Sequence, residues 1–409
     1  MQKQTEIAPV SWVWVLTLFS IASFIETLFW GQMAAFTPLY LPHLGIPQAD
    51  VPRWIGIIVS TSGIFGLPFL PFWGALADRY ARQPIIIRSY LVEMFAGGLT
   101  ILAGNIWVFA FGRIVLSLAL GNSGLMLTTL AEYAPPHRRG LAFAIMNSAG
   151  PVGIFIGPLI GGPIVDRWGF QALLGINIIL LLAVVVSLTF GYRDNYQGTD
   201  RGSLMHMAVD SVRIVLKSSR LRLLFPALFM LFAGWMLAYT YVPLAILSFY
   251  TGNSPGQVIG LILGAGGLLA LVISPLFGML ADRAGHWRVL IIGATLGVIL
   301  WPVPGLVRGL LAFGIAWSII SGLFSGVFAI SFSVLANSAS PEIRGRVMSF
   351  AYLPVNMGYI LGPAIGSVIT KISIFSIFPA AAVITALGIM ALVISYKQNN
   401  DQETVIISS

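Results

Sequence analysis

Long apolar stretches without a charged side chain are the feature that most constrains how this chain can fold. Residues 173–190, LLGINIILLLAVVVSLTF, are one example. About 20 such residues in a helix, rising about 1.5 Å each, cross the hydrocarbon core of a bilayer. Only 9% of the 409 residues are charged, whereas about 25% are charged in an average soluble domain. The sequence therefore predicts an integral membrane protein.

The net charge and the missing motifs exclude several classes of function. A net charge of +8 would suit nucleic acid only on a folded polar domain, for which the polar residues are too few. The chain has no cysteine, which excludes disulfides, thiolate metal sites and cysteine catalysis. It also lacks G-x-x-x-x-G-K-[ST], H-E-x-x-H and G-x-S-x-G, the signatures of ATP-driven pumps, zinc proteases and serine hydrolases. We therefore expect no enzyme, no metal site and no nucleic-acid partner.

Apolar runs separated by polar residues predict twelve membrane spans. The longest polar stretch, 192–222, divides the chain into a six-span half at 1–191 and a second six-span half at 223–409. Within this linker, polar and apolar residues alternate at helical spacing, which predicts a short amphipathic helix on the membrane surface. The twelve predicted spans are 12–35, 54–77, 85–102, 106–130, 141–165, 171–190, 224–249, 258–281, 289–304, 309–336, 346–370 and 374–396.

The distribution of basic residues predicts the orientation of these spans. Of the 22 Lys and Arg residues, 17 fall on the side of the N-terminus and four on the opposite side. Because cytoplasmic loops carry an excess of Lys and Arg, the side of the N-terminus is expected to be cytoplasmic. An even number of spans then places the C-terminus in the cytoplasm as well.

The two halves carry the same short motifs in the same order. GALADRYAR at 74–82 is followed by GMLADRAGH at 278–286, and GPLIG at 157–161 by GPAIG at 362–366. The offsets are 204 and 205 residues, which chance does not explain. Because each unit has six spans, both copies enter the membrane from the same side and form a parallel repeat.

These motifs and their arrangement resemble the major facilitator superfamily over essentially the full chain. The first copy matches the family's loop signature between spans two and three, G-x-L-a-D-r-x-G-r, although Ala81 stands where the family usually has glycine. The resemblance implies an all-α major facilitator fold of two six-helix halves and a cytoplasmic latch that is released during transport. A positive-inside anchor without a switching role is the alternative, but it does not explain the repeated aspartate. The implied latch residues are Gly74, Asp78, Arg79, Arg82, Gly278, Asp282 and Arg283.

The fifth predicted span carries a second motif of small residues. Glycines at every fourth position let helices approach closely, and proline bends the helix. Within the superfamily that this chain resembles, this motif is associated with antiporters, which favours exchange over symport. The eleventh span repeats most of the pattern, so close packing alone is the alternative. The residues concerned are Gly153, Gly157, Pro158, Gly161 and Gly162.

Three ionisable residues lie inside predicted spans, all in the first half. Glu26 lies in the middle of span one, Glu93 near the middle of span three, and Arg113 about two turns inside span four. A charge at the centre of a bilayer costs about 2.5 to 3.5 kcal/mol on insertion scales, so a retained charge indicates function. A low-dielectric environment favours the neutral form of a carboxyl group, which suits proton exchange. We expect Glu26 and Arg113 to couple transport to protons; for Glu93, pairing with a neighbour is the alternative.

Polar and aromatic residues in several spans are candidates for the lining of a central cavity. With few charges available, a substrate would be recognised by shape, by stacking and by attraction of cations to aromatic rings. Two further acidic residues, Glu132 and Asp166, fall near span ends, where helix capping is expected. The candidate lining residues are Trp30, Gln32, Asn147, Trp235, Tyr239, Tyr241, Asn356 and Tyr359.

Together, these features predict a monomeric secondary transporter of the bacterial inner membrane. We expect proton-driven efflux of lipophilic or cationic organic compounds by alternating access between the halves. The proton gradient is the energy source, and no cofactor is expected. The alternatives are a transporter of one specific metabolite, such as a sugar or an amino-acid derivative, and a non-coupled sensor or channel of the same fold.

Overall fold

The computed structural model describes residues 11–67, 69, 81–119, 121–192, 219–338 and 353–408. All regular secondary structure in these residues is helical, which confirms the predicted all-α class. Nine helical segments among them are long and apolar enough to cross a membrane, and one shorter apolar helix, Leu353–Ile369, lies near the C-terminus. The nine segments are Trp12–Leu44, Arg82–Ile101, Ile106–Tyr133, Pro136–Gly191, Leu221–Phe249, Pro255–Ala284, His286–Leu306, Leu310–Ser338 and Ile374–Lys397.

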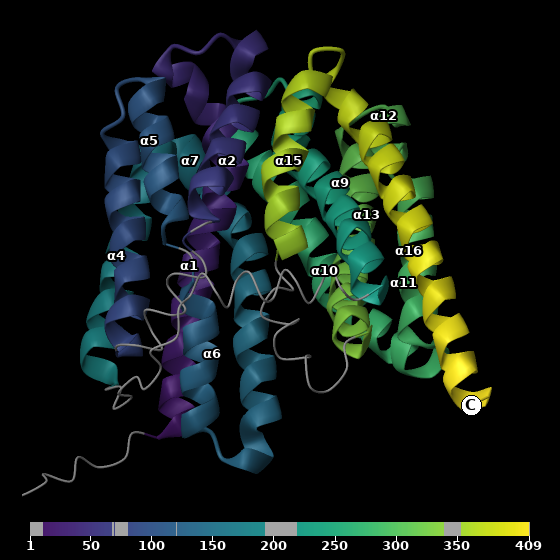
Figure 1. The fold of residues 1–409 in the computed structure, drawn as a ribbon. Coiled ribbons are helices and arrows are strands. Elements are labelled where there is room, and N and C mark those ends of the chain that lie inside the picture. The colour runs from purple at the N-terminus through teal and green to yellow at the C-terminus, as the bar shows by residue number, and fades with distance from the viewer. Residues whose placement is uncertain are drawn as a thin grey trace, which may run out of the picture.

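The helices gather into two bundles that follow the order of the chain (Figure 1). The bundles come together at the end drawn uppermost in Figure 1 and diverge toward the other end. We call the uppermost end, which contains the segment 41–50, the upper end. The first bundle contains α1 (Trp12–Tyr40), α2 (Val51–Gly66), α4 (Arg82–Ile101), α5 (Ile106–Ser117), α6 (Asn122–Tyr133) and α7 (Arg139–Gly191). The second contains α9 (Ser219–Phe249), α10 (Pro255–Ala284), α11 (His286–Leu300), α12 (Val303–Leu306), α13 (Leu310–Ser338), α15 (Leu353–Ile369) and α16 (Ile377–Ser408).

Helix α7 is a hairpin whose two limbs both pack on α1. The chain reverses at Gly169, where φ is 82° and ψ is 167°. Only glycine adopts this conformation readily. The first limb meets the middle of α1, where Gly157 lies against Leu28. The second limb returns along α1 and ends where the Trp14 indole donates a hydrogen bond of 2.8 Å to the Gly191 carbonyl oxygen.

The fourth predicted span, 106–130, is broken rather than continuous. Helix α5 ends at Ser117 and α6 begins at Asn122. Gly121 precedes α6 with φ of 108°, a left-handed conformation that interrupts helical hydrogen bonding. The Arg88 guanidinium of α4 donates a hydrogen bond to the Leu118 carbonyl oxygen inside the break. A side chain therefore satisfies backbone that would otherwise be unpaired in an apolar environment.

The repeated glycine motifs make the same contact in both bundles. A Cβ atom at Gly157 would lie 2.6 Å from the carbonyl oxygen of Leu28 on α1. A Cβ atom at Gly362 of α15 would lie 2.7 Å from the carbonyl oxygen of Ala233 on α9. Both distances are too short for any side chain, so glycine is required for these helices to touch. Close packing therefore accounts for the motif in both halves.

Candidate functional site

Glu26 accepts hydrogen bonds from two other helices inside the first bundle. The Asn122 side-chain amide donates to its Oε2 at 2.7 Å, and the Tyr90 hydroxyl donates to the same oxygen at 3.4 Å. Glu26 is 7% exposed, and both donors are almost completely buried. The break before α6 makes Asn122 the first residue of that helix, which brings its amide to α1. Helices α1, α4 and α6 thus converge on one buried carboxyl group.

Glu93 lies beside this group and has a single hydrogen-bond donor. The Trp30 indole donates to Glu93 Oε1 at 2.9 Å, while Oε2 is buried without a partner among the described residues. Trp30 follows Glu26 by one turn of α1, and Tyr90, a donor to Glu26, precedes Glu93 by one turn of α4, so the two carboxyl groups lie near each other. Among the described residues, neither carboxyl group forms an ion pair. Two unpaired carboxyl groups in a low dielectric favour a shared proton over two negative charges.

Arg113 of α5 is a buried cation without a carboxylate partner. Its residue is 5% exposed, and its Nε and Nη1 atoms have no hydrogen-bond partner among the described residues. Ser117, one turn further along α5, lies against Gly66 of α2, and Gly63 of α2 lies against Tyr359 of α15 in the second bundle. Arg113 is thus outside the hydrogen-bonded group around Glu26, on a helix that lies near the other half of the molecule.

An aromatic cluster, which we define as Trp235, Tyr239, Trp317 and Phe324, occupies the interior of the second bundle. Trp235 of α9 is stacked on each of the other three rings, with centroid distances of 5.4 to 5.6 Å and interplanar angles of 17 to 25°. Offset stacking at this distance is favourable between aromatic rings. Trp235, Trp317 and Phe324 are buried, and the Tyr239 side chain is only partly buried.

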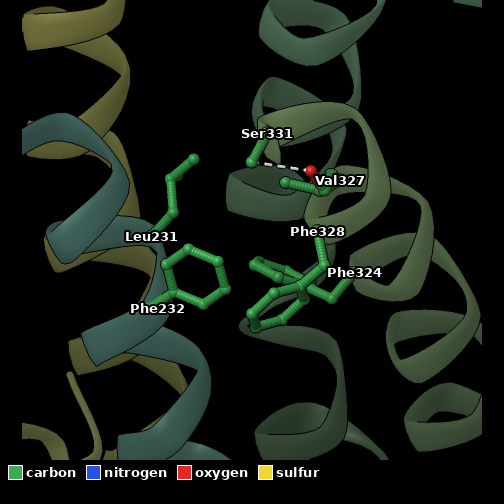
Figure 2. A pocket seen from close by; sticks show the side chains of 6 residues that line it. All are labelled: Leu231, Phe232, Phe324, Val327, Phe328 and Ser331. Carbon is green, nitrogen blue, oxygen red and sulfur yellow. Dashed lines mark hydrogen bonds between the residues drawn. The ribbon is translucent and has the colours of Figure 1, made fainter. Parts of the chain in front are cut away.

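A small apolar pocket, too narrow to admit a water molecule, adjoins the aromatic cluster between α9 and α13. Figure 2 shows Phe232 of α9 facing Phe324 and Phe328 of α13 across it. The one hydroxyl in its lining, that of Ser331, donates a hydrogen bond of 2.7 Å to the Val327 carbonyl oxygen within α13. The pocket thus offers only apolar contacts.

Two sets of polar contacts join the bundles toward the upper end. The Asp166 carboxylate of α7 accepts hydrogen bonds from the backbone N–H groups of Gly256 and Gln257, at 2.7 and 2.8 Å. These groups lie in the first turn of α10, so Asp166 caps a helix of the other half. The Ser60 hydroxyl of α2 also donates to the Ile360 carbonyl oxygen of α15 at 2.6 Å. These contacts close the molecule between its halves.

Sequence comparison supplies the family. The model of the Major Facilitator Superfamily matches residues 18–299 and 224–405. The chain belongs to the Major Facilitator Superfamily. It is 28% identical over 391 residues to the multidrug resistance protein MdtG of Enterobacter lignolyticus, covering 94% of this chain and 91% of that protein. It is 27% identical over 369 residues to MdtG of Citrobacter koseri, covering 88% of this chain and 89% of that protein. The superfamily resemblance noted in the sequence is confirmed.

Solved structures of other transporters share the fold at low sequence identity. The nucleoside transporter NupG superposes with a TM-score of 0.78 and 14% identity, covering 94% of this chain and 99% of NupG. The human organic anion transporter MFSD10 (TETRAN) gives a TM-score of 0.69 and 16% identity, covering 93% of this chain and 99% of that one. This superfamily member is therefore a multi-pass membrane transporter rather than an enzyme.

Some predicted lining residues of the transporter have structural roles instead. The Gln32 amide is buried, donates to the Gly157 carbonyl oxygen at 2.9 Å and accepts from Asn177 at 2.7 Å, which ties α1 to α7. Tyr241 is fully buried, and its hydroxyl donates to the Pro363 carbonyl oxygen at 2.7 Å, which ties α9 to α15. In this structure both polar groups form hydrogen bonds between neighbouring helices, and a role of these residues in the cavity lining stays a prediction.

The other predicted lining residues lie in different surroundings. Trp30 is bonded to a carboxyl group, while Trp235 and Tyr239 belong to the aromatic cluster. Asn147 is exposed on α7, and Asn356 is partly buried on α15. Neither asparagine makes a side-chain hydrogen bond among the described residues, so the structure does not join them to the site.

The predicted latch is only partly within the described residues. Gly74, Asp78 and Arg79 lie outside them, as does the predicted amphipathic helix of the linker. Arg82 is buried and pairs with Glu132 at 2.9 Å, which joins α4 to α6. In the second copy, Asp282 lies 3.7 Å from His286, one turn along the chain. Gly278 has open space around it, and Arg283 is exposed.

Sequence reasoning missed Tyr90 and Asn122 as partners of Glu26. Tyr90 lies in an apolar helix and carries no distinguishing pattern. Asn122 had a usable signal, because GNSG at 121–124 places glycines on both sides of polar residues within an apolar span. Such a pattern indicates a helix break. Broken helices in membrane transporters often place polar groups at substrate or ion binding sites.

Proposed function

We propose that this transporter exports lipophilic or cationic organic compounds in exchange for protons. The observation that carries the proposal is a pair of buried carboxyl groups, Glu26 and Glu93. Hydrogen bonds of Tyr90 and Trp30 place the two near each other, and neither has a cationic partner among the described residues. The relatives named multidrug resistance protein support the choice of substrate class. We further propose twelve spans in two six-helix halves, 1–191 and 223–409 with the linker 192–222 between them, in a monomer of the bacterial inner membrane.

The exchange follows from the cost of an unpaired carboxylate in a low dielectric. Either a proton or a bound organic cation neutralises that charge, so the two compete for the same group. Hydrogen bonds from Asn122 and Trp30 hold the two carboxyl groups in place in either state. Arg113 belongs to the same half and remains a proposed coupling residue, although it forms no ion pair with either carboxyl group among the described residues. Binding of a proton from outside and of substrate from inside would then alternate.

Alternating access requires that each end of the molecule can close. With both termini in the cytoplasm, the upper end is the outer face, and the contacts of Asp166 and Ser60 seal it. The structure then corresponds to the state that is closed to the outside. At the inner face, the repeated motif with Asp78 and Asp282 would form the opposing latch.

The test is transport of a panel of lipophilic cations into energised inverted vesicles. Glu26→Gln keeps an oxygen that accepts the Asn122 hydrogen bond but cannot release a proton. Transport of several cations should be lost in this variant and with a protonophore. Asp50→Asn, a change of an exposed acid at the upper end, is the control and should leave transport intact.

Two outcomes would replace the proposal. Saturable transport of one metabolite, without transport of the cations, would make the protein a specific metabolite carrier. Absence of flux for every compound, in correctly inserted protein, would indicate a sensor of the same fold. Undiminished proton-driven transport in Glu26→Gln would refute the assigned role of the carboxyl pair.

A further inference from the structure

Arg113 has the strongest unmet requirement for a partner in the described part of the chain. A guanidinium presents five N–H donors in a planar fork and stays charged in proteins. Two of its nitrogen atoms, Nε and Nη1, are buried without an acceptor among the described residues. The residue is 95% buried, so bulk water does not compensate for the missing acceptors. A buried charged donor that is left unsatisfied is costly, and an anionic ligand would remove that cost.

The surroundings of Arg113 reach across the interface between the halves. On α2, a Cβ atom at Gly63 would lie 3.5 Å from the Tyr359 ring. One turn further, a Cβ atom at Gly66 would lie 2.9 Å from Ser117, which follows Arg113 by one turn of α5. Because these two positions of α2 carry no side chain, α5 and α15 can both pack closely against its backbone. The glycines therefore bring the part of α5 that carries Arg113 close to Tyr359 of the opposite half.

Tyr359 also lies near the helix that carries part of the aromatic cluster. Its neighbour Gly358 packs against Phe232 and Ala233 of α9, the helix of Trp235 and Tyr239, whose rings stack at 5.6 Å. Neither tyrosine hydroxyl takes part in a hydrogen bond among the described residues. A cation with a planar fork and two hydroxyl groups that have no partner among the described residues thus lie on neighbouring helices, near the stacked rings of the second bundle. This combination matches a planar anionic group attached to an aromatic ring.

We infer that Arg113 and Tyr359 bind the carboxylate or sulfonate group of an aromatic substrate, whose ring lies against the aromatic cluster. The inference rests on the proposed function, because it describes a part of the transport substrate that the carboxyl pair does not recognise. It extends the substrates from lipophilic cations to aromatic acids and to zwitterions that carry both charges. Inorganic anions share the charge but not the ring, so the test separates the two.

The experiment compares three probes with one ring system and different charge. Binding of 1-naphthoate, 1-naphthamide and 1-naphthylmethylammonium is measured by equilibrium dialysis on the full chain in lipid nanodiscs without a proton gradient. The intact protein should bind 1-naphthoate at least tenfold more tightly than 1-naphthamide. Arg113→Gln should abolish this preference while 1-naphthamide binding persists. Arg308→Gln, which removes an exposed cation between α12 and α13, should leave the preference unchanged.

Thermal unfolding distinguishes a binding role from a structural one. If Arg113 awaits a ligand, Arg113→Gln removes an unpaired charge and the ligand-free variant should melt no earlier than the intact protein. Addition of 1-naphthoate should raise the melting temperature of the intact protein and not that of the variant. Earlier melting of the ligand-free variant would show that Arg113 is a structural residue and would overturn the inference.

Three binding results would also overturn the assigned ligand. Equal affinity of the intact protein for 1-naphthoate and 1-naphthamide would show that the protein has no site for the anionic group. Full displacement of 1-naphthoate by an equal concentration of sulfate would show that the ring contributes nothing. An unchanged preference in Tyr359→Phe together with Arg113→Gln would place the site elsewhere. Cation export without 1-naphthoate binding would refute this inference alone, whereas 1-naphthoate binding without cation export would refute the proposed function alone.

Discussion

Replacement of Asp166 should open the upper end of the molecule. Its two carboxylate oxygens accept separate hydrogen bonds, at 2.7 and 2.8 Å, from the first turn of α10 in the other half. Ser254 stands at the N-cap position of α10, but its side chain makes no capping bond. Asp166 therefore supplies across the interface the cap that the helix lacks in its own sequence. This cap exists only while the halves are together at this end.

The size of the effect follows from the number and kind of these bonds. A hydrogen bond to a charged group contributes about 1.5 to 3 kcal/mol, and a negative charge at a helix N-terminus adds about 0.3 to 1 kcal/mol. Asp166 is only partly buried, so solvent weakens both contributions. We therefore take the lower value for a single bond, about 1.5 kcal/mol, as the net loss of free energy in Asp166→Ala. This loss should shift the ratio of closed to open molecules about tenfold.

The assay is a distance measurement between spin labels on the two halves. The chain contains no cysteine, so introduced cysteines are the only labelling sites. Asp50→Cys and Lys371→Cys place labels on exposed positions of the first and second half at the upper end. In the Asp166→Ala background, the population at long distance should grow about tenfold relative to the short one. Arg167→Gln, a change of the exposed neighbour of Asp166, should leave this population unchanged.

An unaltered distance distribution in Asp166→Ala would refute the reasoning. The protein would then be held closed at this end by other contacts, such as the close approach of Gly162 to Gly256. Loss of folded protein would not be mistaken for opening, because opening keeps a defined long distance whereas unfolding broadens the distribution.

Three further predictions concern packing and coupling. Gly157→Ala places a methyl group 2.6 Å from a carbonyl oxygen of α1 and should lower the melting temperature by several degrees, whereas Gly175→Ala, with nothing within 4 Å, should not. Tyr241→Phe removes one buried hydrogen bond and should cost about 1 kcal/mol of unfolding free energy, whereas Tyr239→Phe should cost less because its hydroxyl is unbonded. Asn122→Leu removes the closest donor to the buried carboxyl of α1 and should reduce proton-driven export in vesicles while insertion, measured by membrane yield, is retained; export at the unaltered rate would contradict this role.

The helical architecture could be predicted because membrane spanning leaves a clear trace in composition. Each span is apolar over enough residues to be recognised, and the repeated glycines need no alignment to be seen. The same property hides which way each side chain faces. A helix that is apolar on all sides has no stripe that separates the lipid face from the interior. Gln32 and Tyr241 were for that reason assigned to the cavity lining, although their polar groups hold neighbouring helices together.

Interactions between distant residues were likewise beyond the sequence. Glu26 and Arg113 could be selected as functional because a charge in a membrane requires a reason. Their surroundings could not be predicted. Glu26 meets Asn122 only because the fourth span is broken between α5 and α6. Asp166 was expected to cap a helix at a span end, and it does cap one. That the helix belongs to the other half depends on how the bundles meet, which no local pattern encodes.

The contacts between the halves explain why closure can be reversed. Apolar helices gain little from leaving lipid for each other, because lipid tails are as apolar as the side chains. Association at the upper end therefore depends on close backbone approach at glycines and on a few hydrogen bonds, including those of Asp166. An equilibrium held by so few bonds can be shifted by a ligand whose affinity differs between the two states by a few kcal/mol. A ligand bound between Arg113 and Tyr359 would contact both halves at once. Its binding energy would then act on the same equilibrium as the Asp166 bonds, which links occupancy of the site to the state of the upper end.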